Sequence, residues 1–158
     1  MIVGVLADTH IPKRARSLPL QAYQQLQKAD AIIHAGDVLV EELLRELETL
    51  APVYAVKGNN DGPLDLPPRL DINLAGVQIG VVHETGQSEG RGRRLKRLFP
   101  ESKVVVFGHS HIPTNEWYED LLLFNPGSPT DKRRQPDYTM GLLHLTEGSV
   151  TGEIVTLS

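Results

Sequence analysis

Near its start the chain reads Ile2-Val3-Gly4-Val5-Leu6-Ala7-Asp8-Thr9-His10, an apolar run that ends abruptly in a polar motif. The short run of aliphatic and β-branched residues predicts a buried strand over residues 2–7. The same arrangement recurs further along the chain. Four more polar motifs each follow a predicted strand directly: Gly36-Asp37, Gly58-Asn59-Asn60-Asp61, His83 and Gly108-His109-Ser110-His111. This repetition indicates both the architecture and the place where the chemistry lies.

Helical patterns separate the first strands. Residues 18–29 predict a helix with Ser17 as its N-cap, and apolar residues at helical spacing from Val40 to Leu50 predict a second helix. Further strands are expected over residues 30–35 and 52–56. Strand and helix therefore alternate, which favours a largely parallel sheet.

The second half is organised differently. Residues 69–74 and 77–82 predict two strands joined by a tight turn, and a helix over 88–98 and a strand over 103–107 follow. Beyond Gly108 we expect an antiparallel part made of four strands without intervening helices, over residues 115–119, 121–125, 138–145 and 149–157. The whole pattern predicts an α/β fold of two packed mixed β-sheets flanked by helices. We expect a single domain over residues 1–158, because no composition shift marks a second one.

Composition excludes several classes of protein. A net charge of −4 argues against broad nucleic-acid binding, which needs a basic surface. The chain has no cysteine, so disulfides and thiolate metal sites are impossible. No stretch approaches the roughly 20 apolar residues of a membrane span, and no secretory leader is evident. We therefore expect a cytoplasmic protein without a membrane partner. A homo-oligomer is one expectation, but the sequence leaves the oligomeric state open.

The five polar motifs predict one metal centre. In an open parallel sheet, ligands bind beyond the carboxyl ends of the strands. If the five strands are neighbours, seven potential ligands converge on one crevice: Asp8, His10, Asp37, Asn59, His83, His109 and His111. Imidazole, carboxylate and amide donors suit Mn²⁺, Fe²⁺, Co²⁺, Ni²⁺ or Zn²⁺ better than Ca²⁺. Seven ligands are too many for one tetrahedral ion and suit two divalent ions, with Asp37 as the natural bridge between them.

Such an ion pair has a clear use. Two adjacent ions can lower the pKa of a shared water and hold two oxygens of a phosphoryl group during in-line displacement. The leading prediction is therefore an enzyme that hydrolyses a small phosphate-ester substrate.

These motifs resemble those of the calcineurin-like metallophosphoesterases, and in order and spacing they are most similar to the small, single-domain phosphodiesterase branch. The resemblance covers about residues 1–128 and includes Asn125-Pro126-Gly127-Ser128. It implies a four-layer α/β/β/α sandwich and a dinuclear phosphodiesterase, with Mn²⁺ as the expected metal. It also implies two ligand sets that share Asp37: Asp8, His10 and His111 for one ion, and Asn59, His83 and His109 for the other.

The chain departs from that family pattern at three positions. Asn60 stands where relatives carry a histidine or cysteine proposed as a proton donor. An amide cannot donate a proton as an acid at neutral pH, but it can hydrogen-bond a phosphate or leaving-group oxygen. We therefore expect a preference for good leaving groups, such as aryl or strained cyclic esters. Ile11 and Glu84 each stand where glycine is usual, and Glu84 is expected at the rim of the site.

Several polar residues have a simpler interpretation beside the functional one. His34 is expected to be buried and to support the site behind the ligands, as is Asp61, whereas His144 is expected to be an ordinary sheet residue. Arg133 and Arg134 are candidate contacts for a phosphate, in a basic run that begins at Lys132. Three further groups have mainly structural expectations: a solvated helix face for the basic run from Arg91 to Arg97, a turn for Asn125–Ser128, and sheet packing, rather than a pocket cap, for Trp117 and Tyr118.

Two functions from different classes fit the motifs. The first is the metal-dependent phosphodiesterase. The alternative is a non-catalytic protein-binding scaffold on the same fold, as in the retromer's metallophosphoesterase-like subunit. Members of that kind tend to lose ligand residues, and this chain keeps all seven, which favours the enzyme.

Overall fold

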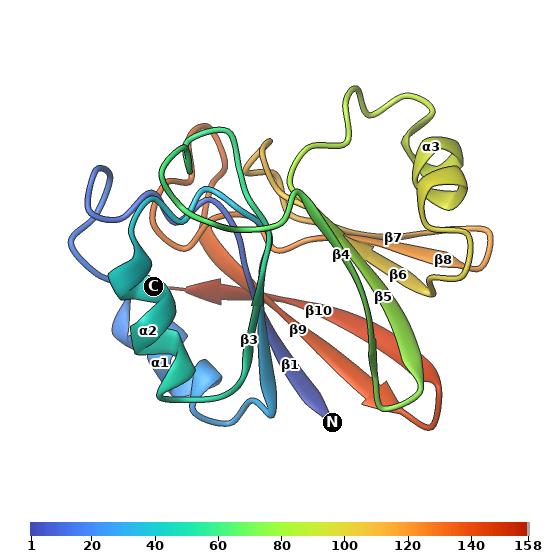
Figure 1. Ribbon diagram of the computed structural model, residues 1–158, viewed down its shortest axis with the longest axis horizontal. Helices are drawn as coiled ribbons and strands as arrows, with labels where there is room; N and C mark the ends of the chain where they lie inside the picture. Colours follow the sequence, from blue (N-terminus) through green and yellow to red (C-terminus); the bar gives the residue numbers. More distant parts are fainter. Residues whose placement is uncertain (158) are drawn as a thin grey trace.

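The computed structural model describes residues 1–157, which form two five-stranded sheets packed face to face with helices outside them (Figure 1). The predicted fold class is confirmed. The first sheet has the order β10-β9-β1-β2-β3, and the second has the order β4-β5-β6-β8-β7. Helices α1 (Leu20–Leu26) and α2 (Glu41–Glu48) cover the first sheet, and α3 (Arg91–Leu98) covers the second.

The first sheet is mixed. Its centre is β1 (Ile2–Leu6), which pairs in parallel with β2 (Ala31–His34), and β2 pairs in parallel with β3 (Val53–Ala55). On its other side β1 pairs antiparallel with β9 (Tyr138–Thr146), which forms a long hairpin with β10 (Ser149–Leu157).

The second sheet is mixed as well. β4 (Arg69–Leu74) and β5 (Val77–Val82) form an antiparallel hairpin, and β6 (Val104–Val106) lies parallel to β5. β8 (Leu121–Asn125) is parallel to β6 and antiparallel to β7 (Thr114–Tyr118). We expected only antiparallel pairing in the second half, and this is wrong for β8. β8 lies between β6 and β7 in the sheet, and its pairing with β6 is parallel.

Alternation along the strands explains the layers. In β6, Val104 and Val106 enter the core between the sheets, whereas Val105 points outward to Leu95 and Phe99 beneath α3. Gly4 of β1 faces the opposite outer layer, where a Cβ would lie 2.6 Å from the side chain of Leu26. Helix α1 can therefore pack closely on the first sheet only because residue 4 lacks a side chain.

The first helix begins and ends inside its predicted range of residues 18–29, and the third begins later than predicted. The first helix begins at Leu20 with Pro19 at the N-cap position, and no side chain caps it, so the assignment of Ser17 as N-cap is wrong. The cause is the non-helical backbone at Pro19 (φ −58°, ψ 148°), which excludes the residues before Leu20 from the helix. The third helix begins at Arg91 rather than residue 88, because Gly90 adopts a left-handed conformation that helical backbone does not permit.

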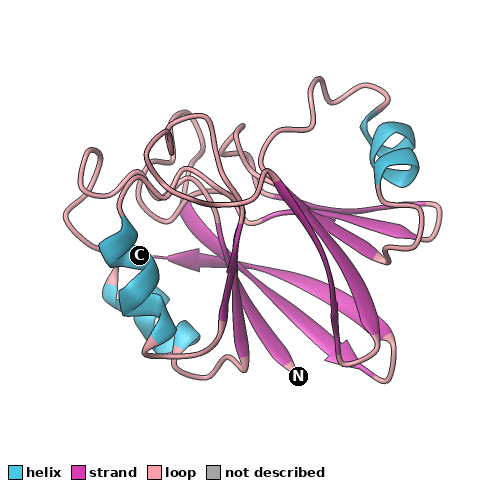
Figure 2. Cartoon of the chain, in the orientation of Figure 1, coloured by secondary structure: helices cyan, strands magenta, loops and turns pink. Residues whose placement is uncertain are grey.

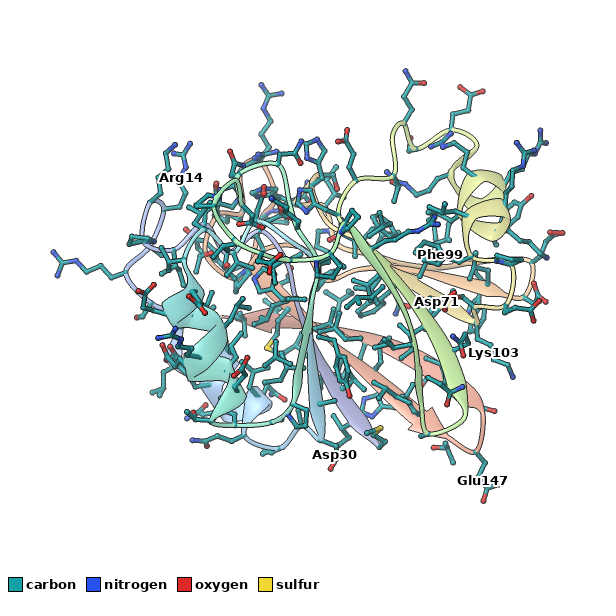
Figure 3. All side chains as sticks on the ribbon, viewed as in Figure 1. Arg14, Asp30, Asp71, Phe99, Lys103 and Glu147 are labelled. Atoms are coloured by element: carbon teal, nitrogen blue, oxygen red, sulfur yellow. The ribbon has the colours of Figure 1, made fainter. Side chains whose placement is uncertain are left out.

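The longer loops gather at one end of the two sheets, and shorter turns join the strands at the other end (Figure 2). Figure 3 places Arg14 at this loop-bearing end, whereas Asp30 and Glu147 lie in turns at the opposite end. The three helices contain only seven or eight residues each, and none of the helices described could cross a membrane.

Candidate metal centre

Both sheets deliver candidate ligands to the loop-bearing end. Asp8 and His10 follow β1, Asp37 follows β2 and Asn59 follows β3, all from the first sheet. The second sheet supplies His83 after β5, and His109 and His111 after β6. Because β1, β2, β5 and β6 are inner strands of the two facing sheets, their carboxyl ends meet in one place.

Five of the seven predicted ligands form two tight groups. Asp8, His10 and His111 form one group, Asp8, Asp37 and His83 form the other, and in each group the candidate ligand atoms lie within 4.8 Å of one another. Asp8 Oδ1 is 3.9 Å from His10 Nε2, 3.8 Å from His83 Nε2 and 3.6 Å from His111 Nε2. Asp37 Oδ2 is 3.3 Å from His10 Nε2 and 3.4 Å from His83 Nε2. The carboxylates of Asp8 and Asp37 therefore both lie between His10 and His83.

Unpaired buried atoms show that these residues fit a metal. Within residues 1–157, four polar atoms of the cluster are buried without a hydrogen-bond partner: Asp8 Oδ1, His10 Nε2, His83 Nε2 and His111 Nε2. Leaving such an atom unsatisfied costs roughly 1–3 kcal/mol. Four converging lone-pair donors would all be satisfied by divalent cations of borderline softness, which bind imidazole and carboxylate together.

Hydrogen bonds behind the histidines fix which nitrogen faces the cluster. His83 Nδ1 lies 2.8 Å from the carbonyl oxygen of Ala35, and His111 Nδ1 contacts the carbonyl oxygen of Asp131. A carbonyl only accepts, so each Nδ1 carries the proton and each Nε2 presents its lone pair to the cluster.

The backbone at the cluster is strained. Five predicted ligands have left-handed φ angles between 48° and 74°, namely Asp8, His10, Asp37, His109 and His111. Each such residue costs of the order of 1–3 kcal/mol and persists only where its surroundings hold it. Glycines beside them permit the close packing that does so. A Cβ on Gly58 would lie 2.2 Å from Asp37 Oδ1, and one on Gly36 would lie 2.6 Å from His83 Nδ1.

Asp61 holds the Asp37 loop. Its carboxylate is fully buried and accepts hydrogen bonds from the backbone N–H groups of Asp37 (2.8 Å), Val38 (3.3 Å), Leu39 (2.8 Å) and Gly58 (2.9 Å). Asp61 therefore lies behind a predicted ligand and outside the cluster itself.

His34 also lies behind the ligands. It is buried, its Nδ1 accepts the N–H of Gly36 at 3.1 Å, and its Nε2 lies 3.0 Å from Thr9 Oγ1. Burial lowers the pKa of His34 to about 4, so the ring is neutral at pH 7 and Nε2–H donates to Thr9. His34 therefore ties together the loops that carry Asp8 and Asp37.

Protons and cations compete for the same atoms in this cluster. The neighbouring carboxylates of Asp37 and then Asp8 raise the pKa of His10 to about 9. Burial alone would raise the pKa of Asp37, but the neighbouring imidazoles of His10 and His83 outweigh burial and lower that pKa strongly. At His111 burial dominates and lowers the pKa.

The remaining two predicted ligands lie at the open side. Asn59 is exposed, and the side chain of His109 is 45% exposed, with its ring edge-on to His83 at 5.4 Å between centroids. Glu84 reaches the same rim, where its Oε1 is 3.7 Å from His109 Nε2. The backbone N–H of His109 donates to Asp8 Oδ2 at 2.9 Å, so this residue also positions a buried carboxylate.

Next to the cluster is a polar pocket of about 390 Å³. Arg133 lines it, as does Asn60, whereas Arg134 does not. Lys132 instead contacts the ring of Tyr138 and the carbonyl oxygen of Pro136. The sequence prediction missed two further lining residues, Lys13 and Arg14, although their place directly after the Asp8–His10 motif was a usable signal.

Two other residues considered in the sequence analysis lie away from the cluster. His144 pairs with Glu153 on β10 at 3.0 Å, as expected of a sheet residue. Trp117 is 55% exposed and lines a separate surface cavity of about 600 Å³. The prediction that it packs in the sheet is wrong, because its face of the edge strand β7 is uncovered.

The basic run and the predicted turn also have structural roles. Arg91 is half-buried over the ring of Phe107, at 4.7 Å, rather than lying on a solvated face. The turn at Asn125–Ser128 supports the site, since Ser128 Oγ donates to the carbonyl oxygen of Asp8 at 2.8 Å.

Comparison with known proteins agrees with this geometry. Residues 1–148 match the model of the calcineurin-like phosphoesterase superfamily domain. The chain belongs to this superfamily. A curated relative from Methanothermobacter thermautotrophicus, named a "Probable metallophosphoesterase", is 35% identical over 98% of this chain and 92% of its own length. A second protein of that name, from Methanocaldococcus jannaschii, is 42% identical over 84% of this chain and 70% of its own length.

The solved structures show the same fold. Vps29 from Entamoeba histolytica, solved in complex with Zn²⁺, aligns with a TM-score of 0.80 at 24% identity and covers 99% of both chains. This superfamily binds divalent metals, and the two groups that share Asp8 are the candidate ligands for them in this chain.

Proposed function

We propose that this metallophosphoesterase is a dinuclear phosphodiesterase that uses two divalent ions, most readily Mn²⁺, to hydrolyse a small phosphate-ester substrate. The observation that carries the proposal is the convergence of four unpaired buried donor atoms, from Asp8, His10, His83 and His111, at one point between the sheets. The same donor set also accommodates Fe²⁺, Co²⁺, Ni²⁺ or Zn²⁺.

Each ion would have its own ligands. Asp8, His10 and His111 would hold one ion, and His83, with Asn59 and His109 from the open rim, would hold the other. Asp37 Oδ2 lies almost equally far from His10 and His83, which suits a carboxylate shared between two ions. When bound, such an ion pair lowers the pKa of a water and neutralises charge on the phosphoryl oxygens.

Asn60 would orient Asp37 and contact the substrate. Its side-chain amide donates to Asp37 Oδ2 at 3.0 Å, and its backbone N–H donates to Asp37 Oδ1 at 2.9 Å. Asn60 also lines the neighbouring pocket. It can therefore hydrogen-bond a phosphate oxygen but cannot protonate a leaving group, which supports a preference for good leaving groups.

The test is turnover of bis-p-nitrophenyl phosphate by Mn²⁺-loaded protein, with bound metal counted by mass spectrometry. We expect about two ions per chain, turnover that chelation stops, and loss of turnover in Asp37→Ala. The matched control is Asp65→Ala, which removes an exposed carboxylate from the loop after β3. No turnover of any phosphate ester by fully metal-loaded protein would contradict the proposal.

The second candidate is a non-catalytic protein-binding scaffold. The observation that favours it is the full-length structural likeness to Vps29, although at 24% identity that likeness shows only the fold. Since that Vps29 was solved with Zn²⁺, metal binding alone does not separate the two candidates. Stoichiometric metal binding without turnover would favour the scaffold.

A further inference from the structure

We propose that the pocket beside the metal centre binds a second phosphate group, so that the preferred substrates are phosphodiesters that carry an additional phosphate. This inference rests on the proposed phosphodiesterase function and names its substrate class. Three cations line the pocket, Lys13, Arg14 and Arg133, against one carboxylate, that of Asp131. A local excess of positive charge in a chain of net charge −4 indicates an anionic occupant.

The cations are available to such an occupant. Within residues 1–157, no carboxylate lies within ion-pair distance of Lys13 or Arg133. Arg133 makes only a weak contact, from Nη1 to the carbonyl oxygen of His109 at 3.4 Å. Arg14 places one nitrogen, Nε, 3.6 Å from Asp131 Oδ2, and its side chain is 61% exposed. An arginine has five N–H donors, so most of its capacity for phosphate remains.

The two loops that form the pocket are fixed to the cluster. The backbone N–H of Arg14 donates to the carbonyl oxygen of His10 at 2.7 Å, which closes a turn directly after a predicted ligand. On the other wall, Ser128 Oγ accepts the N–H of Asp131 at 2.8 Å. The carbonyl oxygen of Asp131 in turn contacts His111 Nδ1. The backbone that carries the cations is therefore tied to the metal ligands on both walls of the pocket.

The chemistry of the lining argues against a base or aryl ring as the main occupant. Leu39 is the one apolar side chain in the lining, and Asn60 and His10 complete it on the side of the cluster. A pocket for a ring would present apolar and aromatic surface. A volume of about 390 Å³ leaves room for a hydrated phosphate group and the sugar that carries it.

Two substrates that differ by one phosphate test the proposal. They are the 5′-p-nitrophenyl phosphate diester of thymidine and the same diester with a 3′-phosphate, each assayed with Mn²⁺-loaded protein. We expect kcat/KM to be about tenfold or more higher for the 3′-phosphorylated compound, the gain typical of a charge-assisted contact. In Arg133→Gln and Lys13→Gln that ratio should fall toward one. The matched control Lys132→Gln removes a neighbouring charge that contacts Tyr138 instead, and it should keep the wild-type ratio.

A binding measurement separates failure of this proposal from failure of the phosphodiesterase proposal. Thymidine 3′,5′-bisphosphate and thymidine 5′-monophosphate are titrated into Mn²⁺-loaded protein by calorimetry, so that the 5′-phosphate is held at the metal centre and only the bisphosphate has a phosphate left for the pocket. Tighter binding of the bisphosphate, weakened in Arg133→Gln but not in Lys132→Gln, supports the pocket even if neither diester is hydrolysed. Equal affinities in the calorimeter, or equal kcat/KM for two hydrolysed diesters, would overturn it while leaving the phosphodiesterase intact.

Discussion

Replacing Asp61 by asparagine is the sharpest probe of how the metal loop is built. The substitution keeps the size and shape of the side chain but changes one carboxylate oxygen into an NH₂ donor. Oδ2 accepts three backbone N–H groups, from Asp37, Val38 and Gly58, while Oδ1 accepts that of Leu39. Whichever way the amide is turned, at least one backbone donor faces another donor.

The structure gives the size of the effect. At least one charge-assisted hydrogen bond is lost and the remaining ones become neutral, which together costs roughly 3–5 kcal/mol of unfolding free energy. For a domain of this size that corresponds to a fall in Tm of about 10–15 °C. Because Asp61 positions Asp37, metal affinity should also fall about 10- to 100-fold.

Calorimetric melting of the EDTA-treated protein and metal titration by calorimetry measure the two effects. Asp65→Asn is the matched control, since Asp65 is exposed on the same loop, and its Tm should stay within about 2 °C of wild type. If Asp61→Asn had the same Tm as Asp65→Asn and bound Mn²⁺ with the same affinity, Asp61 would not organise the loop as described.

Three further outcomes are expected. The lowered pKa of His34 means that the folded state binds fewer protons than the unfolded state between about pH 4 and 6.5. The free energy of unfolding of the wild type, measured with urea, should thus fall by roughly 3 kcal/mol as the pH falls through that window. His34→Gln should not show this fall. Mn²⁺ at 1,000 times its Kd should add about 4 kcal/mol to stability, so a Tm indifferent to EDTA would argue against tight sites. Asn60→His should raise kcat on diesters with poor leaving groups more than on aryl diesters, and an equal change on both would refute the role given to Asn60.

Local signals explain which parts of the fold the sequence predicted. The hairpin strands Arg69–Leu74 and Val77–Val82 were predicted to the residue, because Ala75-Gly76 marks the turn between them. The position of β8 beside β6 could not be predicted, since pairing between distant strands depends on the packing of the whole sheet. The start of α1 was missed because no capping side chain defines it.

The candidate site shows the same division. Strand ends predicted that Asp8, His10, Asp37, His83 and His111 would meet, because parallel strands bring their carboxyl ends to one edge. That one oxygen of Asp8 would lie close to three buried histidines, those of both groups, was not visible in the spacing. Lys13 and Arg14 line the pocket because the backbone N–H of Arg14 closes a turn onto the carbonyl oxygen of His10. No periodic pattern in the sequence predicts that turn.

The division of the donor atoms between the two sheets has a consequence for assembly. Asp8 and His109 are joined by a hydrogen bond across 101 residues of chain, and each three-residue group takes its members from both layers. A nascent chain that has formed only β1, β2 and β3 of the first sheet holds just two carboxylates, one imidazole and the amide of Asn59 in place. High-affinity ion capture must therefore come after the layers have docked, so loading with Mn²⁺ would report completed folding rather than guide its early steps.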